Sequence, residues 1–180
     1  MTKELDEKLC AEFPLIFKNR HGDMRQTAMC WGFQCGDGWY SLIRHLCLRL
    51  TRKLRMEQQS YDFYASMMPE QLASGPEWIR AGASPDKQAA RLAEIARLTA
   101  LVPVASQVKE KFGTLRFYVE ACTPEDGAII SEAEAMSAIV CEVCGMTAGT
   151  KTYTDGWHQT LCPACATAQD RMDDDETLTD

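Results

Sequence analysis

The chain has 180 residues, of which 46% are hydrophobic and 25% charged, with a formal net charge of −7. This composition is ordinary for a soluble globular protein with one substantial core. The N-terminal stretch is charged, and no apolar segment is long enough to cross a bilayer. We therefore expect no secretory signal and no membrane contact, and we expect a cytoplasmic protein.

A short helix is predicted over the first dozen residues, with Thr2 as its N-cap and Pro14 as its stop. The next stretch, 15–36, contains three glycines and predicts loops or short strands. Cys35-Gly36-Asp37-Gly38 then permits two interpretations. One is a reactive thiol at a helix N-terminus, and the other is a glycine-bounded turn in which Asp37 is the N-cap. We favour the cap, because it also explains the glycines.

A long helix is predicted over 38–58, where apolar residues recur at helical spacing. Its other face carries five basic residues within twelve positions and no acid. This face predicts either a solvated helix surface or a contact with nucleic acid or an acidic partner. The candidate contact residues are Arg44, Arg49, Arg52, Lys53 and Arg55.

Segment 59–83 contains two prolines and two glycines, which interrupt any long element, and its aromatic and methionine residues predict a packed excursion. A further helix is predicted up to Pro103, with Ser84 at its N-cap and Pro85 at its first position. We interpret residues 59–100 as a variable insertion into a core domain that spans 1–140.

The pattern alternates after this helix and predicts a β-hairpin over 104–120, with Phe112-Gly113 at its turn. Lys109, Lys111 and Arg116 make this hairpin modestly basic, although Glu110 and Glu120 dilute the effect.

Thr123 and Pro124 then predict the cap and first residue of another helix, which is expected to run directly into Cys141. The predicted fold class is α+β: a helical core with a β-hairpin and a C-terminal zinc ribbon.

Two cysteine pairs, Cys141-x2-Cys144 and Cys162-x2-Cys165, predict the metal ligands of this ribbon, which we place at 141–169. Seventeen residues separate the pairs, a spacing typical of a four-thiolate zinc site. Gly145 follows the first pair, where such a turn often requires positive φ. Asp155-Gly156 predicts a hairpin between the pairs. Four protein ligands fill the tetrahedron, so the expected Zn²⁺ is structural.

Other residues give weaker metal or thiol signals. His158 lies between the pairs and either replaces one thiolate or packs the loop. Cys30 and Cys35, with His45 or His21, are candidates for a second metal site, but their spacing matches no common metal-binding pattern. The chain has nine cysteines, and four ligands leave an odd number, which favours reduced thiols over a disulfide framework. A helix is expected to begin near Ala164 and close the ribbon.

The last eleven residues carry six acids against one base, a net charge of −5, so the other 169 residues carry only −2. Segment 170–180 is therefore predicted to be an acidic, disordered tail. Its candidate roles are solubility or contact with a basic partner surface. The candidate contact residues are Asp173, Asp174, Asp175 and Glu176.

No nucleophile–base spacing, phosphate-binding loop or dinucleotide fingerprint occurs in the sequence. We therefore predict that the protein is not an enzyme, has no catalytic residues and takes no small-molecule substrate.

Three stretches together resemble a family of small, uncharacterised proteins of tailed phages and prophages. Members of that family look like a helix, a hairpin and a helix that leads into a four-cysteine ribbon. The resemblance covers about half of the chain and omits 59–100 and the acidic tail. The stretches are Cys35-Gly36-Asp37-Gly38-Trp39 continuing to Leu42-Ile43, Gln107–Gly113 with Leu115–Tyr118, and Ile139–Gly145 with Trp157 and Thr160–Cys165.

Small phage proteins without catalytic signatures often act by binding a host protein, so the resemblance implies a non-enzymatic inhibitor of a host complex. An acidic phage protein can block a nucleic-acid-handling defence system by covering its basic groove, as many anti-CRISPR and other anti-defence proteins do. The resemblance therefore also implies that the protein acts in the host cytoplasm. The alternative is a nucleic-acid-binding zinc-ribbon accessory or regulatory factor, supported by the basic face at 44–55 and the basic hairpin. Its weakness is the sequence pI near 5.0.

Overall fold

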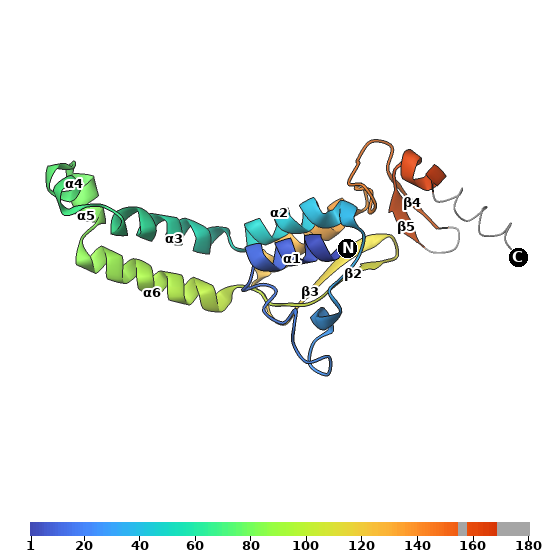
Figure 1. Ribbon diagram of the computed structural model, residues 1–180, viewed down its shortest axis with the longest axis horizontal. Helices are drawn as coiled ribbons and strands as arrows, with labels where there is room; N and C mark the ends of the chain where they lie inside the picture. Colours follow the sequence, from blue (N-terminus) through green and yellow to red (C-terminus); the bar gives the residue numbers. More distant parts are fainter. Residues whose placement is uncertain (155–157, 169–180) are drawn as a thin grey trace, which may run out of the picture. The chain divides into compact units, whose positions relative to one another are not determined.

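The computed structural model describes residues 1–154 and 158–168, which fold as two compact units (Figure 1). The first unit comprises Met1–Leu48 and the described residues from Pro103 onward. The second unit, Arg49–Val102, contains the expected insertion and begins ten residues before it. The predicted α+β class, a helical core with a hairpin and a C-terminal four-cysteine module, is confirmed.

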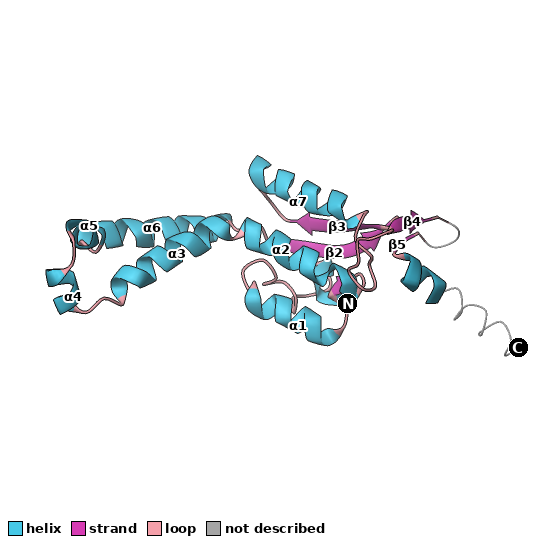
Figure 2. Ribbon diagram, turned by 90° about the horizontal axis from the view of Figure 1, so that it is seen from above, coloured by secondary structure: helices cyan, strands magenta, loops and turns pink. Residues whose placement is uncertain are grey.

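The first unit is built on a three-stranded sheet with the order β1-β2-β3, of which β2 and β3 are labelled in Figure 2. β1 (Phe33–Gln34) pairs in parallel with β2 (Ala105–Lys111), which pairs antiparallel with β3 (Thr114–Val119). The predicted β2–β3 hairpin is confirmed, with Phe112 and Gly113 both at positive φ in its turn. The pairing with β1 was not predicted, because a two-residue strand leaves no alternation in the sequence.

One face of this sheet belongs to the core. Val108, Leu115 and Phe117 are buried on it, beside Phe33 of β1. Helices α1 (Lys3–Glu12) and α2 (Tyr40–Leu50), with the segments next to them, contribute many of the other buried apolar residues of this unit. The main contributors from these helices and the segments next to them are Leu9, Phe13, Ile16, Phe17, Trp39, Ile43 and Leu46.

Helix α7 (Pro124–Ser137) runs along the free edge of β3. Ser137 Oγ accepts the Leu115 N–H at 2.8 Å, and Glu134 Oε1 accepts the Phe117 N–H at 2.8 Å. The predicted cap is confirmed: Thr123 accepts from the Asp126 N–H, and Asp126 accepts from the Thr123 N–H. The helix does not run directly into Cys141 as predicted, because it ends at Ser137 and a turn follows.

The predicted single helix over 38–58 is wrong. A short 3-10 turn, η2 (Asp37–Trp39), precedes α2, and α2 ends one residue before Thr51. A separate helix, α3 (Arg52–Ala65), begins after Thr51, so the predicted basic face does not lie on one continuous helix. The helical spacing of apolar residues over 38–58 did not reveal the break, because it continues through both helices. The two helices differ in what they pack against: α2 packs in the core of the first unit, whereas α3 packs against α6 of the second.

The second unit is a helical hairpin. α3 and α6 (Pro85–Leu101) pack side by side, and the short helices α4 (Pro69–Ser74) and α5 (Glu77–Gly82) connect them (Figures 1 and 2). Half-buried positions recur at spacings of three and four residues on both long helices, as in an antiparallel coiled coil. None of the residues in these four helices is fully buried.

The ends of this hairpin follow the local signals. Ser84 and Pro85 occupy the predicted N-cap and first position of α6, although the Ser84 hydroxyl donates to the Ala81 carbonyl instead of capping. Near this end, the Arg91 guanidinium lies 4.5 Å from the centre of the Tyr64 ring and donates to the Gly82 carbonyl.

A buried ion pair joins α1 to the loop that follows it. Asp6 is 7% exposed and accepts from Nε and Nη2 of Arg20 at 2.8–3.0 Å. Replacing Arg20 with methionine is expected to lower the free energy of unfolding by about 3 kcal/mol, because the Asp6 carboxylate is left buried without its partner. Urea unfolding measures this difference.

The matched control is Lys8→Gln, which breaks the exposed Lys8–Glu4 pair on the same helix. We expect the urea midpoint of this variant to equal that of the unaltered protein. Equal midpoints for Arg20→Met and Lys8→Gln would contradict the structural role of the Asp6–Arg20 pair.

Candidate metal centre

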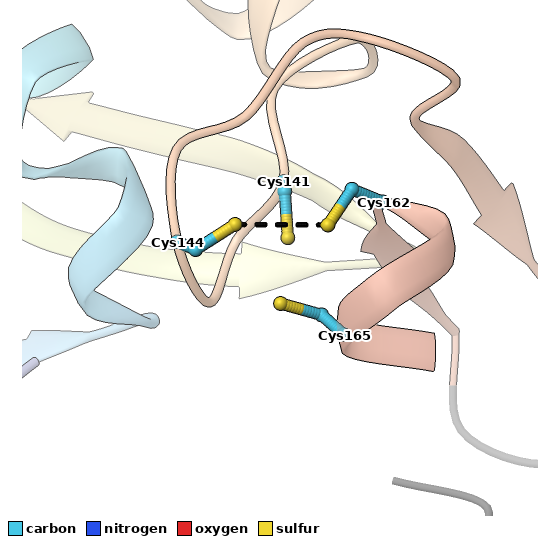
Figure 3. Close-up of side chains that lie close together, drawn as sticks. All are labelled: Cys141, Cys144, Cys162 and Cys165. Carbon is cyan, nitrogen blue, oxygen red and sulfur yellow. Dashed lines mark hydrogen bonds between the residues drawn. The ribbon is translucent and has the colours of Figure 1, made fainter. Parts of the chain in front are cut away.

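Four cysteine sulfurs converge between the loop after α7 and a short helix at 163–168 (Figure 3). The Sγ atoms of Cys141, Cys144, Cys162 and Cys165 all lie within 4.8 Å of one another. The Cys144 and Cys162 sulfurs are 3.7 Å apart. Zn–S bonds of 2.3 Å in a tetrahedron separate the sulfurs by about 3.8 Å, so the cluster has the dimensions of a tetrathiolate metal site.

The chemistry of the sulfurs also suits a metal ion, because the thiolate is the form that binds metals. Burial opposes ionisation of Cys141, but the backbone N–H groups of Cys144, Cys162 and Val143 outweigh it and lower the Cys141 pKa to about 7. Burial and hydrogen bonds to the other cysteines raise the pKa of Cys165. Four crowded thiols therefore resist full ionisation unless a cation offsets their charge.

Backbone geometry shapes the first cysteine turn as the sequence predicts. Gly145 has φ +78°, and its N–H donates to the Cys141 carbonyl at 2.8 Å. The Cys141 N–H donates in turn to the Met146 carbonyl at 2.8 Å. A side chain at position 145 would strain this turn, which explains the glycine directly after Cys144.

The segment Gly36–Trp39 packs against the first cysteine turn and donates hydrogen bonds to it and to the residue before it. We call this segment the knuckle seat. The Gly38 N–H donates to the Glu142 carbonyl at 2.7 Å, and the Gly36 N–H donates to Glu142 Oε1 at 2.9 Å. Trp39 Nε1 donates to the Val140 carbonyl at 2.8 Å. The two glycines therefore serve the close approach of two backbones, and neither sequence interpretation of this motif found that role.

Asp37 is not an N-cap as predicted. It begins the turn η2, and its Oδ1 accepts the backbone N–H of Thr2 at 2.6 Å, at the start of α1. The alternative of a reactive Cys35 thiol also has no support in this environment. Cys35 is 7% exposed, and burial raises the pKa of its thiol to about 12.

The second cysteine pair follows a two-stranded ribbon, β4 (Lys151–Tyr153) and β5 (Gln159–Leu161). Thr160 is fully buried between the ribbon and the core: its carbonyl accepts the Glu142 N–H, and its hydroxyl donates to the Gly113 carbonyl in the β2–β3 turn. These bonds place the ribbon in the same compact unit as the core. The predicted turn at Asp155-Gly156 lies outside the described residues, and the closing helix is described over 163–168.

The other metal and thiol candidates do not converge. The His158 ring lies 5.7 Å from the Phe112 ring and is not part of the four-cysteine cluster. Cys30, Cys35, His21 and His45 form no second metal-binding group within the described residues. The Cys10 and Cys47 thiols are poor nucleophiles, since burial raises the pKa of Cys10 to about 12 and that of Cys47 well above its ordinary value.

The candidate partner contacts lie on different elements. Arg44 forms two hydrogen bonds of 2.7 Å with the Glu12 carboxylate, so its charge is already paired. Arg49 lies on α2 and belongs to the second unit, with α3 carrying the other three predicted contacts, Arg52, Lys53 and Arg55. The acidic contacts Asp173, Asp174, Asp175 and Glu176 lie outside the described residues.

Comparisons with protein-family models, with curated proteins and with solved structures find no match to this chain. The resemblance to tailed-phage proteins therefore stays a prediction. No helix in the described part of the chain is long and apolar enough to span a bilayer.

Proposed function

We propose that this chain is a non-enzymatic binding protein whose four-cysteine cluster holds a structural zinc ion. Cys141, Cys144, Cys162 and Cys165 supply four sulfurs, the set that zinc prefers in closed tetrahedral sites. With all four positions filled by protein, a bound ion has no vacancy at which to activate water or substrate. The role of the metal is therefore to fold the ribbon onto the core.

The observation that carries the binding role is the exposed apolar surface of the helical hairpin. Several large apolar side chains in this unit are about half exposed or more, including Met56 (56%), Phe63 (49%) and Trp78 (60%). Met56 and Phe63 are seven residues apart and so lie on the same side of α3. Helices normally bury such a stripe against another element, and exposed apolar patches of this kind mark interaction sites.

We assign this surface to a host protein, in line with the resemblance to phage proteins. A complex that handles nucleic acid, above all a defence system in the host cytoplasm, is the partner class that the acidic chain favours. Inhibition or redirection of that complex then follows from occupation of its surface, without any chemical step.

Capture from host lysate with the tagged protein, followed by quantitative mass spectrometry, tests this proposal. We expect one protein complex in near-stoichiometric amount, and a loss of about tenfold or more with the double variant Met56→Gln/Phe63→Gln, because buried apolar anchors dominate interface energy. The matched control is Met24→Gln in the first unit, where the side chain is 63% exposed.

Equal capture by both variants would remove the hairpin from the proposed interface. Sedimentation of the purified protein covers the other outcome. If the unaltered protein sediments as a dimer and the double variant as a monomer, Met56 and Phe63 serve self-association. The host-complex proposal would then fail.

A further inference from the structure

The outer face of the three-stranded sheet carries a cluster of cations. In the strand register, Lys109 lies opposite Arg116, Lys111 opposite Thr114, and Gln107 opposite Tyr118. These pairs alternate with the buried pair Val108–Phe117 and therefore project to the other side of the sheet. Gln34 of β1, beside Lys109, extends this face. We call Gln34, Gln107, Lys109, Lys111, Thr114, Arg116 and Tyr118 the sheet platform.

The platform carries three positive charges and no carboxylate. Glu110 belongs to the inner side, opposite Leu115, where its Oε1 accepts the Gly113 N–H. Within residues 1–154 and 158–168, none of Lys109, Lys111 and Arg116 forms an ion pair. The positive charge of the platform is opposite in sign to that of the whole chain, which has a net charge of −7.

The pairing within the platform is unfavourable for the protein alone. Lys109 and Arg116 are direct cross-strand neighbours, and like charges directly opposite each other destabilise a sheet. An anion bound between them offsets this repulsion. The arrangement therefore favours a polyanionic ligand that follows the strands.

Aromatic rings lie next to two of the three cations of the platform. Lys109 Nζ lies 5.9 Å from the centre of the Tyr118 ring, and Lys111 Nζ lies 5.4 Å from that of Phe112. Tyr118 is 41% exposed and Phe112 is 65% exposed. The Phe112 ring also contacts His158, 5.7 Å away on the adjacent ribbon. Exposed rings beside cations provide a surface on which unpaired bases stack.

We propose that the sheet platform, with Phe112 at its end, binds single-stranded nucleic acid. The cations contact phosphates while Tyr118 and Phe112 stack on bases about 14 Å or more apart, the length of four paired residues along the strands. Duplex DNA fits less well, because its bases are stacked internally and present no free faces to these rings. This surface lies in the first unit, so the inference does not depend on the helical hairpin or its partner.

Fluorescence anisotropy of labelled oligonucleotides with the purified, zinc-loaded protein tests the proposal. The probes are single-stranded DNA, single-stranded RNA and duplex DNA of equal length, with heparin as a competitor that has no bases. We expect single strands to bind more tightly than the duplex. With three phosphate contacts, the logarithm of the binding constant should fall with the logarithm of salt concentration with a slope of about −2.

Variants separate the two kinds of contact. Arg116→Gln should reduce the salt slope by about 0.7, since one phosphate contact is lost. Tyr118→Thr should weaken single-strand binding about tenfold and leave the slope unchanged. The matched control, Lys87→Gln, removes an exposed cation from α6 and should change neither quantity.

Fold integrity is checked with the same proteins. Because Lys109→Gln relieves a like-charge pair, we expect its melting temperature to equal or exceed that of the unaltered protein while its binding weakens. The proposal would be overturned if no oligonucleotide bound at low salt, or if duplex and single strands bound with equal affinity. It would also be overturned if heparin displaced the single strand equally well from Tyr118→Thr and from the unaltered protein. The last two outcomes would show a general polyanion surface without base stacking.

Discussion

Replacing Cys162 with serine is expected to abolish stoichiometric zinc binding and to lower the free energy of unfolding by about 4 kcal/mol or more. Cys162 is 3% exposed, and its sulfur lies 3.7 Å from that of Cys144. Loss of one thiolate opens the tetrahedron, and the binding free energy of a structural zinc ion is largely folding free energy. Elemental analysis of zinc per chain and urea unfolding measure the two effects.

The control is Cys122→Ser, which removes an exposed thiol that is not part of the cluster. We expect this variant to keep one zinc ion per chain and an unchanged urea midpoint. Treatment of the unaltered protein with a strong chelator should reproduce the Cys162→Ser result. One zinc ion per chain and full stability in Cys162→Ser would refute the assignment of this residue as a ligand.

Gly38→Ala is expected to lower the free energy of unfolding by about 3 kcal/mol, although residue 38 binds no metal. A Cβ atom at this position would lie 2.2 Å from the Cys141 carbonyl oxygen and 2.5 Å from the Gly145 nitrogen. Both neighbours are backbone atoms, so relief requires displacement of the whole first cysteine turn. Thermal or urea unfolding measures the loss.

Zinc content distinguishes this variant from the ligand variant. All four cysteines remain in Gly38→Ala, so we expect one zinc ion per chain despite the lower stability. The matched control is Gly127→Ala in α7, where a Cβ atom would meet nothing closer than the Cys122 sulfur at 3.9 Å. Alanine should stabilise that helix by about 0.5–1 kcal/mol. Equal stability of the two alanine variants would contradict the close packing of the knuckle seat.

Local signals in the sequence determined several elements of this protein correctly. Cys141-x2-Cys144 and Gly145 specify the first cysteine turn, because the required dihedral angles involve consecutive residues. The same holds for the cap formed by Thr123 and Asp126 and for the β2–β3 hairpin with its turn at Phe112-Gly113. Each of these features is completed within a few positions of the residues that encode it.

Only the tertiary structure decided what the Cys35–Trp39 motif does. Its glycines looked like parts of a turn, but they leave room for a backbone about 100 residues further along the chain, with the Gly38 N–H bound to the Glu142 carbonyl. The break at Thr51 is of the same kind. The apolar stripe continues through it, and only the different packing partners of α2 and α3 separate the two helices.

The same limit applies to the charged surfaces. The sequence grouped Arg44 with four other cations on one helix, whereas the fold pairs Arg44 with Glu12 and divides the helix. By contrast, the pairing of Lys109 with Arg116 lies within the local β2–β3 hairpin, and the sequence already grouped these two cations. Spacing along the chain identified local turns and the four cysteines that cluster. Which charges face each other and which backbones touch depends on contacts between distant segments, and these form only when the core assembles.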